Sequence, residues 1–134
     1  MNQEEKQLLL KDLCARLPYK IRVKVSEVSY PVEFDVQMLA EIKNNNWYEY
    51  PIPYLRPMSS MTEEEKEEIS QKLNYEFYID EDAALCAEDE RHRIRLDLIE
   101  VYIDWLNKNH FDYRGFIEKG LAIEAAEGMY NITK

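Results

Sequence analysis

The first quarter of the chain changes from a helical to a strand-like pattern of apolar positions. An apolar stripe runs from Leu9 to Leu17, Asn2 is placed to cap its start, and Pro18 ends it. This pattern predicts a helix over 2–17. The next residues, 21–25, alternate strictly between apolar and charged side chains, which predicts a half-buried strand.

Two further segments before residue 57 also indicate extended structure. Apolar and polar residues alternate over 32–38, so we predict a second strand that continues through 36–42, although the apolar spacing of 36–42 also fits a helix. The three asparagines at 44–46 predict a turn. Proline cannot donate to a β-ladder, so 47–55, with two prolines, should lie at a sheet edge or run as a polyproline-like extension.

The second half of the chain has mainly helical patterns. Thr62 and Glu65 form a capping-box sequence that predicts a helix over 62–73, followed by a short strand or extended link at 75–79. A long core helix is predicted over 82–109, with apolar positions at Ile94, Leu98, Val101, Tyr102, Trp105 and Leu106. A short helix over 113–119 should end at Gly120, and the tail from Glu127 is expected to be frayed.

Together these elements predict one α+β domain spanning 1–134. Its first part, 1–57, combines the N-terminal helix with a three-stranded antiparallel meander, for which closure toward a small barrel stays open. The part at 62–122 is helical, and 127–134 is the tail. A chain of 134 residues is long enough to bury a core without a second domain.

The composition of the chain indicates the cellular location in which we expect to find the protein. No apolar run approaches the roughly 20 residues of a membrane helix, and the acidic N-terminus lacks the features of a secretory signal. The two cysteines, Cys14 and Cys86, are isolated and suggest neither a disulfide framework nor a zinc site. We therefore expect a cytoplasmic protein without a membrane partner.

The net charge of −10 comes from one block of the sequence. Residues 63–90 hold 12 acidic and 2 basic side chains, whereas acidic and basic residues balance on either side. Such a block is often only a solvated helix face. We nevertheless predict an interaction face for a basic protein partner at Glu64, Glu68, Asp80, Glu81, Asp82, Glu88 and Asp89. An acidic surface disfavours direct nucleic-acid binding, which requires clustered cations, but an acidic mimic of nucleic acid is an alternative.

A search of the sequence for metal-binding and catalytic motifs gives little support for an enzymatic function. A calcium-loop alignment that starts at Asp80 fails, because Leu85 stands where glycine is needed and Arg91 where glutamate is needed. No phosphate-binding glycine loop or nucleophile motif is present in the sequence. We expect no metal, no cofactor and no catalytic residue.

One short cluster keeps a second interpretation open. His110, Asp112, Tyr113 and Arg114 supply the residue types of an acid–base or small-ligand site. The structural interpretation is that His110 caps the long helix and Asp112 caps the next one. A shared pocket for the four side chains would favour the ligand site, and their dispersal would favour an interaction protein.

Three stretches, at 8–19, 53–65 and 103–122, resemble a family of small proteins of Bacteroides-type gut bacteria and of their phages and mobile elements. The most specific of them is Pro-Tyr-Leu-Arg-Pro-Met-Ser-Ser-Met at 53–61. The resemblance covers about a third of the chain and implies a bacterial or phage protein of the cytoplasm, without an activity to carry over. The function that we predict is therefore a non-enzymatic interaction or regulatory role, through the acidic face or a tyrosine-rich sheet edge.

Overall fold

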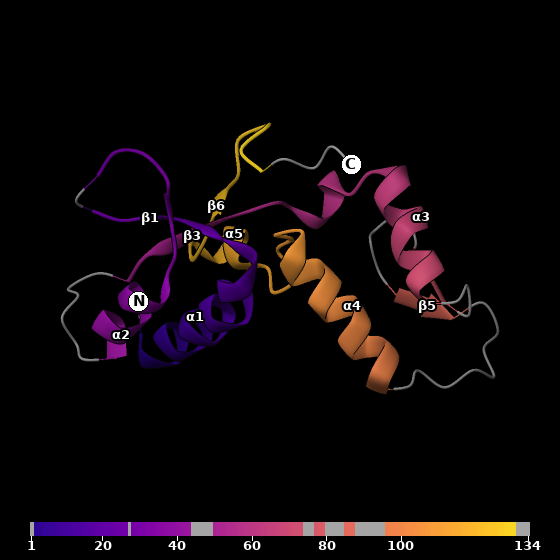
Figure 1. The fold of residues 1–134 in the computed structure, drawn as a ribbon, viewed down its shortest axis with the longest axis horizontal. Helices are drawn as coiled ribbons and strands as arrows, with labels where there is room; N and C mark the ends of the chain where they lie inside the picture. The colour runs from indigo at the N-terminus through magenta and orange to yellow at the C-terminus, as the bar shows by residue number, and fades with distance from the viewer. Residues whose placement is uncertain are drawn as a thin grey trace.

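Figure 1 shows the computed structural model of the chain, in which residues 2–26, 28–43, 50–73, 77–79, 85–87 and 96–130 are described. One end of the molecule holds helices α1 and α2 with a small sheet, and α3 lies at the opposite end with α4 running between them (Figure 1). The arrangement of an N-terminal helix, a sheet and further helices confirms the predicted α+β class.

The N-terminal helix forms as predicted. Helix α1 (Gln3–Arg16) begins at a complete capping box, in which the Asn2 side chain accepts from the Glu5 amide at 2.8 Å and the Glu5 carboxylate accepts from the Asn2 amide at 3.0 Å. Pro18 lies in the single 3₁₀ turn η1 (Leu17–Tyr19) that follows. Lys20 then adopts a left-handed conformation with φ of 59°, which turns the chain into the sheet.

The main sheet has four strands in the order β2-β1-β3-β6. Strand β1 (Arg22–Lys24) confirms the predicted first strand and pairs antiparallel with β2 (Val32–Glu33) and with β3 (Ile52–Leu55). Strand β6 (Ile123–Glu124) pairs parallel with β3. The predicted three-stranded meander is therefore wrong in its order, because β1 and not β2 occupies the middle and a C-terminal strand joins the sheet.

The segment after β2 is a helix, which corrects the predicted continuation of the strand through 36–42. Helix α2 (Val36–Lys43) begins after Asp35, whose Oδ1 accepts from the Met38 amide at 2.9 Å and whose carbonyl accepts from the Leu39 amide at 3.1 Å. The helical spacing buries Ile42, whereas Val36 is left 68% exposed. The cap at Asp35 is the local feature that selects the helix.

The proline-bearing strand β3 lies inside the sheet, which corrects its predicted place at an edge. Pro53 pairs in register with Val23 of β1. On its other side, β6 pairs only with Tyr54 and Leu55, so Pro53 has a paired strand on one side alone. The missing amide of proline is tolerated at such a position. The predicted asparagine turn at 44–46 lies outside the described residues.

The second half of the chain contains η2 (Met58–Ser60), α3 (Glu63–Lys72), β4 (Phe77–Ile79), β5 (Leu85–Ala87), α4 (Leu96–Lys108) and α5 (Phe116–Lys119). The capping box at Thr62 and the left-handed C-cap at Gly120 confirm two of the predicted helix boundaries. The predicted helix over 82–109 is wrong at 85–87, where β5 pairs antiparallel with β4, and it is confirmed over 96–108; its residues 82–84 and 88–95 lie outside the described residues. Pairing with β5 satisfies backbone groups of β4 that would otherwise lack partners.

Two apolar clusters form the described core. One lies between α1, the sheet and α5, and includes Leu13, Val23 and Phe116. The other lies between α3 and α4 and includes Ile69, Trp105 and Phe111. Of the core positions predicted on α4, Tyr102, Trp105 and Leu106 are buried, but Val101 is 39% exposed because it lies to one side of this stripe. The short segment from Phe111 to Phe116 thus links both clusters.

Candidate functional site

The turn between α4 and α5 is tied to the end of β3 by backbone hydrogen bonds. The Arg56 amide donates to the His110 carbonyl at 2.8 Å, and the Asp112 amide donates to the Arg56 carbonyl at 2.8 Å. His110 adopts a left-handed conformation with φ of 65°, which ends α4 and redirects the chain. This turn carries all four residues of the predicted small-ligand cluster, so their surroundings decide whether they converge.

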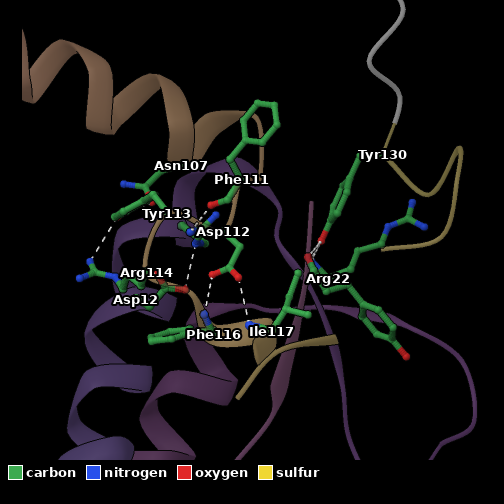
Figure 2. A network of polar contacts seen from close by, with 12 residues as sticks. Asp12, Arg22, Asn107, Phe111, Asp112, Tyr113, Arg114, Phe116, Ile117 and Tyr130 are labelled. Carbon is green, nitrogen blue, oxygen red and sulfur yellow. Dashed lines mark hydrogen bonds and ion pairs between the residues drawn. The ribbon is translucent and has the colours of Figure 1, made fainter. Parts of the chain in front are cut away.

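Asp112 stabilises the start of α5. Its Oδ1 accepts from the Phe116 amide at 2.8 Å and its Oδ2 accepts from the Ile117 amide at 3.0 Å (Figure 2). The side chain is buried, so both of these oxygens are committed within the protein. Asp112 therefore accepts from the first two amides of α5, as a helix cap would. The predicted start of this helix at residue 113 is wrong, however, because α5 begins at Phe116 and its N-cap position is Gly115.

Tyr113 and Arg114 belong to a buried polar network with α1. Arg114 Nε lies 3.0 Å from Asp12 Oδ1 (Figure 2). Arg16 Nε lies 2.9 Å from Asp12 Oδ2, so one carboxylate pairs with two guanidinium groups. Asp12 and Arg16 are completely buried. Arg16 also donates to the Phe111 carbonyl at 2.6 Å, which fastens the turn to the helix.

Sequence reasoning did not identify Asp12 and Arg16. Their spacing of four residues on the predicted helix, on the same side as Leu9 and Leu13, was the available indication of an inward-facing ion pair. Buried charges are normally paired and hydrogen-bonded, and both ion pairs of Asp12 have that character, although Arg16 Nη1 has no hydrogen-bond partner among the described residues. Its position between two elements indicates a structural role.

His110 stacks against Tyr130, with ring centroids 3.8 Å apart. The Tyr130 hydroxyl donates to the Tyr54 carbonyl at 2.7 Å and accepts from the Arg22 amide at 3.0 Å (Figure 2). These contacts fix the chain to the sheet as far as Tyr130, which corrects the expectation that the tail frays from Glu127. Residues 131–134 lie outside the described part of the chain.

Both rings of this stack have shifted pKa values. Burial, followed by the charges of Arg16, Arg56 and Arg22, lowers the pKa of His110 from 6.5 to about 4, so the imidazole is neutral at pH 7. Burial raises the pKa of Tyr130 to about 12, against the opposing hydrogen bond from Arg22. His110 Nδ1 is buried and has no hydrogen-bond partner among the described residues.

Two cavities lie beside Tyr130, and only one of the predicted cluster residues reaches either of them. A cavity of about 250 Å³, which we call the basic cavity, is lined by Lys20, Arg22, Lys108, Glu33, His110 and Tyr130, among others. A second cavity of about 410 Å³ is lined by Arg56, Ser60 and the segment 124–128, and also by Tyr130. Asp112, Tyr113 and Arg114 line neither cavity, so the four residues of the cluster are dispersed.

Arg56 and Glu65 form a buried ion pair that joins β3 to α3. The guanidinium meets the carboxylate through two hydrogen bonds of 2.8 and 2.7 Å, and Glu65 also accepts from the Thr62 amide. Burial acts to raise the pKa of Glu65, but the hydrogen bonds from Arg56 and Thr62 outweigh it and hold the pKa below its ordinary value. This member of the acidic block therefore has a structural role.

The predicted acidic interaction face is only partly described. Glu64 is exposed on α3, whereas Glu68 is half-buried and accepts a hydrogen bond from Trp105 Nε1 at 2.6 Å. The other five residues of the predicted face, Asp80, Glu81, Asp82, Glu88 and Asp89, lie outside the described residues. The alternative of a continuous acidic ridge that imitates nucleic acid stays a prediction.

Neither a metal centre nor a membrane helix occurs in the described ranges. No group of three or more histidine, cysteine or acidic side chains is arranged there to hold a metal ion. None of the helices described is both long enough and apolar enough to cross a bilayer.

No protein-family model, curated protein or solved structure matches this chain. The resemblance to proteins of gut bacteria and their phages stays a prediction, and the function must be argued from the geometry of the chain itself.

Proposed function

We propose that the protein acts by binding a basic segment of a protein partner, and not by catalysis. The proposed docking surface is the acidic surface of α3, which we define as Glu63, Glu64 and Glu67. All three side chains are exposed, and Glu63 is 92% exposed. The partner that this surface fits is a lysine- or arginine-rich segment.

The observation that carries this proposal is the division of glutamates along α3. Glu65 and Glu68 turn inward to Arg56 and Trp105, whereas Glu63, Glu64 and Glu67 are exposed, and of these Glu63 lies 3.4 Å from Lys66. The positive end of the helix dipole favours Glu63 and Glu64 in the first turn, but Glu67 lies beyond that turn. The exposure of these three carboxylates on one helix is therefore what supports the proposal.

The surroundings of the predicted small-ligand cluster favour binding over acid–base chemistry. The Asp112 carboxylate accepts hydrogen bonds from two backbone amides of α5, and Arg114 forms an ion pair with Asp12. An acid–base site requires its groups to face one substrate, and these side chains face the protein interior. The sequence block at 63–90 adds the remaining support, because its excess of ten acidic residues over basic ones continues beyond α3.

The test is binding of a fluorescein-labelled peptide of nine arginines, measured by fluorescence anisotropy at 50 and 300 mM NaCl. The double variant E64Q/E67Q should raise the dissociation constant at least fivefold, and the wild-type affinity should fall at the higher salt. The matched control E4Q/E118Q removes two exposed charges elsewhere and should change the dissociation constant less than twofold. Equal weakening by both double variants, or no binding by the wild type, would contradict the proposal.

A further inference from the structure

We propose that the basic cavity binds a small anion with two or more negative charges, of the kind that a phosphate ester presents. This site is separate from the acidic surface of α3 and does not depend on the function proposed above. The charged residues of the cavity come from parts of the chain in which acidic and basic residues balance, so three cations beside one carboxylate is a locally uneven distribution of charge.

The charges that line the cavity favour a dianion. Lys20, Arg22 and Lys108 contribute three cationic side chains, and Glu33 is the one carboxylate lining it. Within the described ranges, none of the three cationic side chains forms a hydrogen bond or ion pair. Counted over the described lining residues, the charge is +2, and a phosphate ester carries about −1.5 to −2 at neutral pH.

The fold holds these cations in place from three separate elements. Lys20 is placed by its left-handed backbone after η1, and Arg22 lies on the exposed side of β1 because Val23 turns inward. Lys108 is the last residue of α4. Because each backbone position is fixed by a strand or by the end of a helix, little ordering of the backbone is required when a ligand binds.

The C-terminal end of α4 also borders the cavity, and exposed carbonyl groups there would repel an anion. Most of these carbonyls already have donors. The Trp105 carbonyl accepts from the Asn109 amide and side chain, the Leu106 carbonyl from the Phe111 amide, and the Asn107 carbonyl from the His110 amide. Lys108 adds a cation at the same end, so the helix terminus does not prevent anion binding.

The remaining walls set the size and character of the ligand. Tyr19 and Tyr130 contribute aromatic rings, and the neutral imidazole of His110 adds a polar group without charge at pH 7. The cavity has a volume of about 250 Å³ and is open to solvent on one side. This space suits a phosphate or carboxylate group with a few attached atoms.

The acidic helix α3 does not cancel the positive charge of the cavity. It lies at the far end of the molecule (Figure 1), and charges more than about 8 Å apart are largely screened at physiological salt.

Calorimetric titration with inorganic phosphate, pyrophosphate and citrate tests the proposal. We expect the wild type to bind pyrophosphate or citrate, and the double variant R22Q/K108Q to raise that dissociation constant at least tenfold. The control K11Q/K119Q removes two exposed cations outside the cavity and should change it less than twofold. Circular dichroism and the Tm of each variant verify that these surface substitutions leave the fold intact.

Three outcomes would overturn the proposal. The first is that the wild type binds none of the three anions. The second is that R22Q/K108Q and K11Q/K119Q weaken binding equally, which would mean attraction by overall charge. The third is that a ten-nucleotide single-stranded DNA binds more tightly than pyrophosphate and loses affinity in R22Q/K108Q, which would assign the cavity to a nucleic-acid backbone.

Discussion

The His110 imidazole and the Tyr130 phenol stack with their ring centroids 3.8 Å apart and their planes within 20° of each other. His110 ends α4, and Tyr130 is the last residue of the described C-terminal segment. Through its hydroxyl, Tyr130 also bonds the backbone of Arg22 on β1 and of Tyr54 on β3. One aromatic pair therefore joins the end of a helix, two strands and the C-terminal segment.

Substitution Tyr130→Phe keeps the stacked ring but removes the hydroxyl. The Arg22 amide and the Tyr54 carbonyl then lose a hydrogen-bond partner, so we expect the free energy of unfolding to fall by about 2 kcal/mol. Urea denaturation measures this loss. The control Tyr30→Phe changes a 62% exposed ring and should stay within about 0.5 kcal/mol of wild type. Equal stabilities of the two variants would contradict the role of the Tyr130 hydroxyl.

Stability should fall when the pH is lowered from 7 to 5. The folded-state pKa of His110 is about 4 and its ordinary value is 6.5, so between these values the unfolded chain binds a proton that the folded protein excludes. We expect a loss of about 2 kcal/mol over this range, measured by urea denaturation at several pH values. The pKa of Glu65 is lowered from 4.5, so its own loss of stability begins mainly at lower pH.

An asparagine variant tests whether His110 is responsible for this pH dependence. His110→Asn should flatten the change in stability between pH 7 and 5, and asparagine tolerates the left-handed backbone at this position. A wild-type slope in His110→Asn would show that this assignment is wrong.

Asp112 should contribute to stability through its two hydrogen bonds to α5. Asp112→Ala leaves the amides of Phe116 and Ile117 without their side-chain acceptor and should cost about 1–2 kcal/mol. Asp112→Asn retains one acceptor oxygen, so its loss should be intermediate. Thermal and chemical unfolding of the three proteins gives this order. A wild-type stability for Asp112→Ala would refute the capping role.

The buried pair of Arg56 and Glu65 should show strong energetic coupling. Arg56→Leu leaves a buried carboxylate without its cation and should cost about 3–5 kcal/mol, whereas the double variant R56L/E65L should lose at least 2 kcal/mol less than the sum of the single losses. Denaturation of all four proteins in the double-mutant cycle measures this coupling.

The pair of Lys66 and Glu63 provides the matched comparison, because its nitrogen–oxygen distance is 3.4 Å and Glu63 is highly exposed. Its cycle with alanine substitutions should give a coupling below about 1 kcal/mol. Similar coupling energies for the buried and the exposed pair would mean that burial does not strengthen the interaction of Arg56 with Glu65.

Sequence reasoning succeeded where the determining residues lie within one helical turn or one strand. The N-cap at Asn2, the capping box at Thr62, the inward side chain of Val23 and the left-handed end at Gly120 were predicted, and all depend on residues at most four positions apart. Reasoning failed at 36–42, where both periodicities fit. It also failed at 85–87, where pairing with β4 favoured a strand over the predicted helix.

Prediction from the sequence was less successful for the polar sites than for the helices and strands. His110, Asp112, Tyr113 and Arg114 are neighbours in sequence, yet their side chains are divided between an aromatic stack, a helix cap and an ion-pair network with α1. The cations of the basic cavity come from segments that are far apart in the chain, and no local pattern connects them.

By itself, the sequence determined the α+β class, the starts of α1 and α3, the ends of α1, α3, α4 and α5, and the concentration of negative charge at 63–90, because these depend on composition and on local backbone preferences. Only the tertiary structure decided the strand order, the neutral state of His110 and the meeting of Lys20, Arg22 and Lys108 around one cavity. The physical reason is that burial, pairing across a sheet and electrostatic interaction depend on distance in space, which the folded chain sets independently of distance along the sequence.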